Sequence, residues 1–217
     1  MSPTERTKVR RHPERGAYDA ETIHAILDAG FLCHVGFVDE GQPYVIPTLY
    51  CRSGDTLYLH GSSLSRMAQR LQAGIALCVT VTHVDGIVVA RSGFNSSINY
   101  RSVMVLGTGR LVEDRADKLA AMNALIDGVV PGRAADMRPP TTKELNATAI
   151  IAIRIDEASA KVRTGPPKDP AKDRRLDLWA GVIPAAFQVG EPEDSPDLGA
   201  GIDVPEYVRR FIDGADT

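Results

Sequence analysis

The residues best suited to chemistry form a strand-to-helix junction at His60 to Met67, with the sequence His-Gly-Ser-Ser-Leu-Ser-Arg-Met. The apolar run Thr56 to Leu59 precedes it, and the helix-like run Leu64 to Gln72 follows it. The free N–H groups and the dipole of a first helical turn favour an anion, and serine hydroxyls and a guanidinium add charge-assisted hydrogen bonds. The junction therefore predicts a phosphate site. The alternative is an ordinary surface helix that a serine caps, with Arg66 in solvent.

Other common catalytic sets lack their local signatures. The chain has no Gly-x-Ser-x-Gly elbow, no Walker phosphate loop and no Gly-x-Gly-x-x-Gly after a strand. Its five histidines do not pair at His-x-x-x-His spacing, so no metal site is predicted. Most carboxylates fall in turns or early in helices, where capping explains them. No side chain is assigned as a catalytic acid, base or nucleophile.

Pro47 interrupts an otherwise good strand, Tyr44 to Cys51. A proline removes a ladder donor, so this strand is predicted to lie at an edge or to be interrupted, with backbone groups free for a ligand. A plain bulge is the alternative. An organic cofactor with a phosphate tail and a flat apolar head would use both this strand and the junction.

The elements that position these residues follow from periodicity, caps and turns. Asp19 is predicted to cap a short amphipathic helix that stops at Gly30. The predicted strands lie at 31–38, 44–51, 56–60, 75–83, 87–91 and 148–155, with a turn at Asp85-Gly86, and a long bent strand at 97–113 has bulges at Gly107 and Gly109. Residues 157–164 are expected to start as a turn and to end as an extended segment. The predicted helices lie at 64–72, at 116–127 with its apolar residues on one side, and at 205–212; a loop at 131–140 precedes one capped helical turn from Thr141 to Glu144.

Long, bent, glycine-kinked strands are typical of barrels. We therefore expect a mainly β protein, a β-barrel of six to seven antiparallel strands with peripheral helices. The expected organisation is an N-terminal arm at 1–18, one barrel domain at 19–189, and a C-terminal loop and short helix at 190–217.

Composition limits the partners. The 217 residues carry a net charge of -3 with scattered basic residues, which favours neither a nucleic-acid partner nor a membrane surface. Cys33, Cys51 and Cys78 each lie in an apolar run and are expected to be reduced core residues. No secretory signal and no membrane span are expected, so a cytoplasmic location is predicted.

The chain resembles the pyridoxamine 5′-phosphate oxidase-related flavin-binding family over residues 6 to 184, most closely the branch with the nitroimidazole-resistance proteins. The motifs occur in the family's order: Gln42-Pro-Tyr-Val-Ile-Pro-Thr, Leu57-Tyr-Leu-His-Gly-Ser, Ser65-Arg-Met, Asn99-Tyr-Arg-Ser-Val-Met-Val-Leu-Gly, Lys161-Val-Arg and Trp179-Ala-Gly-Val. The resemblance implies an FMN-binding split barrel that forms a homodimer, with one FMN in each of two clefts at the subunit interface.

The resemblance also implies where FMN would bind. It places the isoalloxazine ring along Val45 to Leu49, chiefly against the backbone of Pro47 and Thr48. The remaining implied cofactor residues are Leu49 at the ring, His60, Ser62, Ser65 and Arg66 at the phosphate and ribityl tail, Arg101 and Ser102 in place of the family's Arg-Gln pair, and Trp179, which would close the site from its own subunit or from the other one.

Two departures argue against true pyridoxamine 5′-phosphate oxidase activity. Met67 stands where the oxidase has a lysine beside its phosphate-binding arginine, and Ser102 stands where it has a glutamine. The late Arg-x-His segment of the oxidase is absent. Lys161 and Arg163 are either solvated or supply an anion contact for a substrate above the flavin.

Three functions remain open at this point. The leading hypothesis is an FMN-dependent oxidoreductase that moves electrons between a donor, such as NADH or NADPH, and a small-molecule acceptor. The second is a flavin-binding sensor or cofactor store without turnover. The third is a barrel that binds haem or a deazaflavin instead, in which His60 or His83 would be the axial ligand of a haem.

Overall fold

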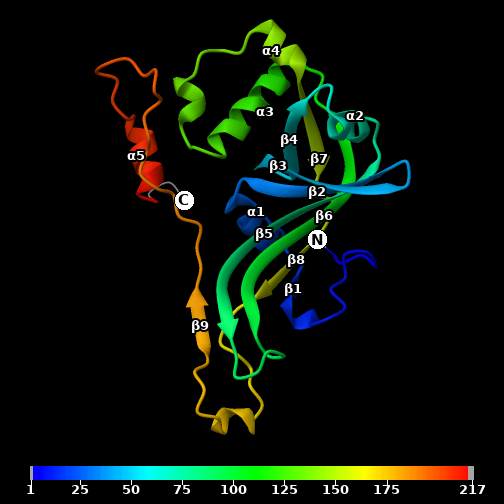
Figure 1. Ribbon diagram of the computed structural model, residues 1–217. Helices are drawn as coiled ribbons and strands as arrows, with labels where there is room; N and C mark the ends of the chain where they lie inside the picture. Colours follow the sequence, from blue (N-terminus) through cyan, green and yellow to red (C-terminus); the bar gives the residue numbers. More distant parts are fainter. Residues whose placement is uncertain (1, 215–217) are drawn as a thin grey trace.

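The computed structural model describes residues 2–214, and its strands form an antiparallel sheet that closes on itself (Figure 1). The strand order is β1-β8-β6-β7-β4-β3-β2-β5-β9, and an additional β5–β6 pairing closes a ring of six strands. The ring consists of β2 (Leu32–Asp39), β3 (Gln42–Ser53), β4 (Thr56–Ser62), β5 (Ala76–Val89), β6 (Ser97–Leu111) and β7 (Thr148–Arg154). The strands β1 (Gly16–Ala17), β8 (Glu157–Arg163) and β9 (Gly181–Pro184) flank it.

The described residues thus form nine strands, more than the expected six to seven. The additional strands are the two-residue β1 and the four-residue β9, which are too short to produce an alternating pattern. Each forms by pairing with a distant partner, β1 with β8 and β9 with β5. The barrel with peripheral helices is confirmed.

The helices begin where the capping residues predicted. The Asp19 carboxylate accepts a hydrogen bond from the Thr22 N–H at 2.7 Å, and Thr141 and Glu144 form a reciprocal capping box. The α-helices are α1 (Ala20–Asp28), α2 (Arg66–Gln72), α3 (Arg115–Asp127), α4 (Thr142–Ala147) and α5 (Glu206–Ile212), and the 3-10 helices are η1 (Pro13–Arg15), η2 (Arg133–Asp136) and η3 (Asp173–Arg175). No helix within residues 2–214 is long and apolar enough to cross a membrane.

Alternate residues of the strands fill the barrel. On β2, Cys33, Val35 and Phe37 point inward and are buried, and α1 adds Ile23 and Leu27 to the same core. The inward face of the barrel therefore carries the hydrophobic stabilisation, and the outward face is free for ligands or partners.

All three cysteines are free thiols, with Cys33 and Cys51 buried and Cys78 half-buried. Burial raises the pKa of the Cys33 thiol to about 12. This agrees with the expectation of inert core residues.

Two local expectations were wrong. Asp85-Gly86 is not a turn: β5 continues through it with a register shift between Val84 and Gly86. A Cβ on Gly86 would lie 2.9 Å from Val182 Cγ1, so the glycine allows β9 to approach closely. No register shift occurs at Gly107 or Gly109; instead, β6 leaves β5 and β8 there and pairs with β7 from Gly109 onward.

Candidate cofactor site

The β3 strand has an open edge around Pro47. Residues 42–49 of β3 pair with β2, whereas only Tyr50 to Ser53 pair with β4. On the N-terminal side of Tyr50, β3 separates from β4. Across this opening the Thr48 hydroxyl donates to the His60 carbonyl at 3.5 Å. β3 is continuous through Pro47 and pairs there with β2, so the strand is not interrupted. The expected edge is observed instead, because residues 42–49 have no second strand partner and leave backbone groups free on that side.

The strand-to-helix junction lies at this same opening. Helix α2 begins at Arg66, two residues later than predicted, because Ser65 is its N-cap and accepts from the Ala68 N–H at 3.2 Å. The Ser62 hydroxyl accepts from the Leu64 N–H at 3.3 Å. Both serine hydroxyls therefore hold the turn, and each keeps its own proton available for a further acceptor.

Arg66 is the exposed cation of the junction. Its guanidinium carbon lies 4.6 Å from the centre of the Tyr44 ring, and its Nε lies 3.7 Å from an Asp39 carboxylate oxygen. Its side chain is 54% exposed, and Asp39 is held more closely by Arg70, whose Nε lies 2.7 Å away. The long contact with Asp39 leaves Arg66 able to turn toward an anion. Met67 is buried in the core, so its position faces away from such an anion.

A cavity of about 500 Å³ lies beside the open edge, and we refer to it as the His60 cavity. It extends from β3 and β4 across α3 to the segment that joins α3 to α4. Its lining residues are Leu49, His60, Met122, Asn123, Leu125, Ile126, Arg133, Asp136, Met137, Arg138, Pro140, Glu144 and Thr148. Its size and its apolar floor are those of a small-molecule site.

His60 is the residue of this cavity that lacks a partner. Its Nδ1 is buried and makes no hydrogen bond to any described residue. An unpaired buried nitrogen is costly, so such an atom points to a ligand that the protein itself does not supply. By contrast, the His83 Nε2 lies 2.9 Å from the Ile26 carbonyl and is already engaged.

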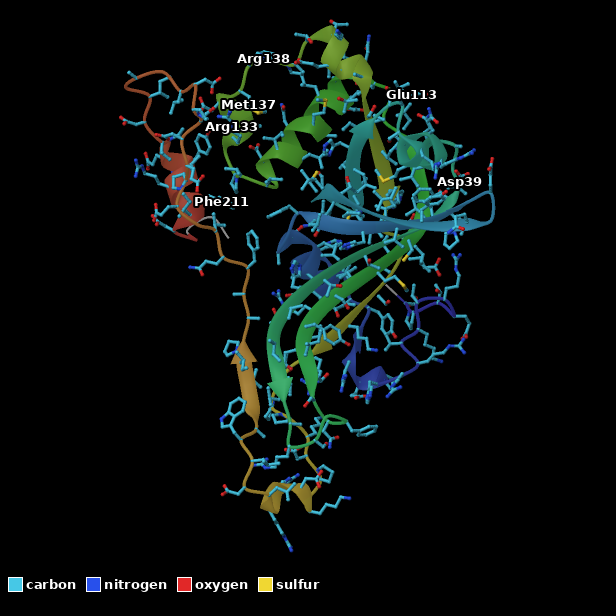
Figure 2. The ribbon with its side chains drawn as sticks, viewed as in Figure 1. Asp39, Glu113, Arg133, Met137, Arg138 and Phe211 are labelled. Carbon is cyan, nitrogen blue, oxygen red and sulfur yellow. The ribbon has the colours of Figure 1, made fainter. Side chains whose placement is uncertain are left out.

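The polar rim of the His60 cavity comes from the segment between α3 and α4. Figure 2 shows Arg133, Met137 and Arg138 gathered on this segment, opposite α5. Arg133 donates to the Tyr207 hydroxyl at 2.9 Å and so links the segment to α5. Hydrogen bonds from Arg138, and from the backbone of Thr141, lower the pKa of Glu144 to about 2.

Comparison with known proteins identifies the family of this chain. The family model described as pyridoxamine 5′-phosphate oxidase matches residues 19–162. The chain belongs to the pyridoxamine 5′-phosphate oxidase family. The resemblance noted in the sequence is thereby confirmed, and no curated protein matches the chain.

Two solved structures resemble this chain over nearly its whole length. The flavocytochrome Anf3 from Azotobacter vinelandii is 44% identical, with a TM-score of 0.91 over 96% of this chain and 97% of that one. A FAD and haem binding protein from Mycobacterium smegmatis is 40% identical, with a TM-score of 0.86 over 90% of this chain and 96% of that one.

A more distant structure supports the fold alone. A candidate 5-nitroimidazole antibiotic resistance protein from Bacteroides thetaiotaomicron is 24% identical, with a TM-score of 0.57 over 68% of this chain and 86% of that one. The expected branch of the family is therefore represented among its structural neighbours.

Not all the family positions meet at the opening. Arg101 and Ser102 lie on β6, where Arg101 forms a bidentate pair with Asp85 and Ser102 donates to the Lys161 carbonyl at 3.3 Å. The hydrogen bonds to Asp85 raise the pKa of Arg101. Trp179 precedes β9 and is 66% exposed. In Figure 1, β9 lies at the opposite end of β5 from α2, so within one chain Trp179 is far from the junction.

Sequence reasoning missed the far wall of the His60 cavity. On α3, Met122, Leu125 and Ile126 all line the cavity, and Leu125 and Met122 also belong to a small core around Cys51. The available signal was the run of apolar residues on α3, which was interpreted as a single buried face. The rim residues Arg133 and Arg138 lie in what was expected to be a loop, and nothing in their spacing distinguished them.

No cluster of three or more histidine, cysteine or acidic side chains suited to a metal ion occurs in the described part of the chain.

Proposed function

We propose that the protein is an oxidoreductase that binds a flavin and a haem. The observation that carries this proposal is His60, which lines an apolar cavity beside the open edge of β3 and whose buried Nδ1 has no hydrogen-bond partner among the described residues. An apolar pocket with one free imidazole suits a haem, for which histidine is a common axial ligand. The two relatives that are 44% and 40% identical, a flavocytochrome and a FAD and haem binding protein, support the same pair of cofactors.

The flavin would be held at the open edge and the junction. The backbone of Pro47, Thr48 and Leu49 would pair with the polar ring edge, because this part of β3 has no second strand. Ser62, Ser65 and Arg66 would contact the phosphate, where Arg66 supplies positive charge and the serines supply hydroxyl protons. When bound, a flavin supplies hydride and one-electron chemistry.

We propose FAD for this flavin, in place of the FMN that the family resemblance implied. The relative from Mycobacterium smegmatis, 40% identical over 90% of this chain, is named as a FAD binding protein. The two flavins share the ring and the first phosphate, so the residues at the junction serve either one.

The haem would occupy the His60 cavity, where it would supply one-electron chemistry at its iron. His60 would provide the nitrogen ligand, and Met122, Leu125 and Ile126 line the same cavity as apolar walls. Arg133 and Arg138 lie at the rim, where cations would attract the carboxylates of a porphyrin. His83 is disfavoured as a ligand because its nitrogen is bonded to Ile26.

We also propose that the protein forms a homodimer. After β9 the chain runs away from the barrel to α5, which contacts the segment between α3 and α4 through Arg133 and Tyr207. On either side of β9 the side chains of Trp179 and Phe187 are 66% and 78% exposed, although the Phe187 ring packs edge-on against Phe31. Exposed apolar side chains of this size mark an interaction surface. A second copy placed on this surface would bring its Trp179 toward a neighbouring flavin. NADH or NADPH remains the proposed electron donor, and the free buried thiols fit a cytoplasmic location.

The test of the cofactor proposal is the absorption spectrum of protein produced with added haem precursor. We expect a Soret band together with flavin bands. The His60→Ala variant is expected to lose the Soret band, to keep the flavin bands, and to regain a Soret band when free imidazole is added. The matched control His83→Ala is expected to keep both. A Soret band that survives in His60→Ala and disappears in His83→Ala would overturn the assignment.

Two further measurements address the flavin and turnover. Chromatography of the cofactor released by acid distinguishes FAD from FMN. Anaerobic stopped-flow mixing with NADH or NADPH, followed by oxygen or another acceptor, distinguishes an enzyme, which is reduced and reoxidised, from a store that does not respond.

A further inference from the structure

The C-terminal helix α5 contacts the rim of the His60 cavity, although none of its own residues lines that cavity. Figure 2 shows α5, with Phe211, beside the segment that carries Arg133 and Met137. The helix has one half-buried side, which consists of Tyr207, Val208, Phe211 and Ile212. Residues three and four apart lie on one face of a helix, so α5 presents a single face to the rim, with Tyr207 in that face.

Tyr207 packs against the backbone of Gly132. This glycine has a φ of 87°, and a Cβ on it would lie 3.3 Å from the Tyr207 Cβ. The next residue, Arg133, begins the 3-10 helix η2. The backbone of η2 is held by α3, because the Asp127 carboxylate accepts from the Ala134 N–H at 2.8 Å. α5 therefore acts on the Arg133 side chain, while α3 holds the backbone beneath it.

Arg133, Tyr207 and Asp136 form a closed cycle of hydrogen bonds. The Arg133 Nη1 donates to the Tyr207 hydroxyl at 2.9 Å, and that hydroxyl donates to Asp136 Oδ2 at 3.0 Å. Nη1 also donates to the same Asp136 oxygen at 3.4 Å. Within residues 2–214, the Nε and Nη2 of Arg133 make no hydrogen bond. Because a guanidinium is a rigid planar fork, a fixed Nη1 also restrains the directions in which Nε and Nη2 point.

The second arginine at the rim, Arg138, is already paired. Its Nη1 donates to one Glu144 oxygen at 2.9 Å, and its Nη2 donates to the other at 2.5 Å. A bidentate pair of this kind is stronger than the single long contact between Arg133 and Asp136. Of the two rim arginines, Arg133 is therefore the one that can bind an anionic group of a ligand with the smaller loss of existing contacts.

We infer that Tyr207 is a positioning residue for the His60 cavity: its hydroxyl holds the Arg133 guanidinium so that Nε and Nη2 bind a carboxylate of the occupant. The occupant is taken to be a porphyrin, so this inference rests on the proposed function. A donor that is oriented before the ligand arrives lowers the entropy cost of binding. The inference gives the C-terminal segment a part in ligand recognition, although α5 contributes no fully buried side chain to the fold.

The test is titration of the haem-free full chain with haemin and with haemin dimethyl ester, followed by the Soret band. The two probes share the iron and the ring, whereas the ester lacks both free carboxylates. We expect the wild-type protein to bind haemin at least about tenfold more tightly than the ester, since one charge-assisted contact accounts for about that factor. Arg133→Ala is expected to lose most of this preference.

Tyr207→Phe is the decisive variant, because it keeps the ring against Gly132 and removes only the hydroxyl. We expect its preference for haemin over the ester to fall about two- to tenfold, the effect of one hydrogen bond, while its affinity for the ester stays within about twofold of wild type. The matched control Tyr58→Phe removes a tyrosine hydroxyl outside the His60 cavity and is expected to leave both affinities unchanged.

The ratio of the two affinities separates positioning from a structural role. If Tyr207→Phe weakens both probes by the same factor, or if its preference equals that of the wild type, the inference is wrong although haem binding stands. A wild-type protein that binds haemin and the ester equally well would also overturn it. A wild-type protein that binds neither probe would refute the haem proposal and this inference together.

Discussion

Replacement of Arg66 by alanine is expected to weaken flavin binding while it leaves the fold nearly intact. In the structure Arg66 stacks on Tyr44 and makes only a 3.7 Å contact with Asp39. The stacking contributes about 0.5–1 kcal/mol at an exposed site, and a half-exposed ion pair adds less than about 1 kcal/mol. The loss in the free energy of unfolding should therefore be about 1 kcal/mol.

The expected loss of flavin affinity is larger. A charge-assisted contact with a phosphate contributes about 1.5–3 kcal/mol. Release of the Asp39 contact offsets up to about 1 kcal/mol of this gain, so the net effect of Arg66→Ala is about tenfold in the dissociation constant. Fluorescence quenching of FAD or FMN titrated into flavin-free protein measures it.

Arg70→Ala is the matched control, since Arg70 lies on the same helix one turn later and binds the same carboxylate. Its Nε lies 2.7 Å from Asp39, which is 11% exposed, so its removal leaves a nearly buried carboxylate poorly paired. We expect a loss of about 1–3 kcal/mol in unfolding free energy and no change in flavin affinity. If Arg66→Ala changes only stability, with an unaltered dissociation constant, Arg66 belongs to the Asp39 cluster and the phosphate assignment is refuted.

Two other predictions concern the barrel and the cavity wall. A Cβ on Gly109 would lie 2.7 Å from Ile151 Cγ2, so Gly109→Ala should lower the unfolding free energy by about 1–3 kcal/mol and shift the urea midpoint downward. A Cβ on Gly93 would have no heavy atom within 4 Å, so the control Gly93→Ala should leave the midpoint unchanged. Equal shifts in the two variants would contradict this reasoning. The contacts with Arg138 lower the pKa of Glu144 from 4.5 to about 2, so their stabilising effect is present above about pH 4.5 and is lost as the pH falls toward 2. The protection of the cavity wall against hydrogen exchange, corrected for the intrinsic exchange rate at each pH, should fall over that range, and much less so in Glu144→Gln; unchanged protection in the wild type would count against the pair.

Much of the fold was predictable because its signals are local. The Asp19 cap and the Thr141 capping box involve residues within one turn of each other. The β2–β3 hairpin turns at Glu40-Gly41, where φ is 51° and 81°, and glycine accepts such a backbone readily. The run from Ser97 to Leu111 forms one long strand, as its alternation indicated.

The parts of the site that were predictable also lie close together in the chain. His60, Ser62, Ser65 and Arg66 fall within seven residues, so the strand-to-helix order alone places them at one junction. Pro47 marked the open edge because a proline cannot donate to a ladder. The sequence itself therefore determined the caps, the order of the strands along the chain, the junction and the open edge at Pro47.

The tertiary structure decided the rest, since long-range contacts leave no periodic trace in a sequence. The separation of β3 from β4 beyond Tyr50 opens the edge, and α3 covers it to form the His60 cavity. Only the packing of α1 against β5 bonds His83 to Ile26 and leaves His60 unpaired. The cavity of about 310 Å³ under the N-terminal arm likewise exists because the arm meets strands more than sixty residues away, and there Lys8, Arg11 and Lys161 converge without ion-pair partners among residues 2–214.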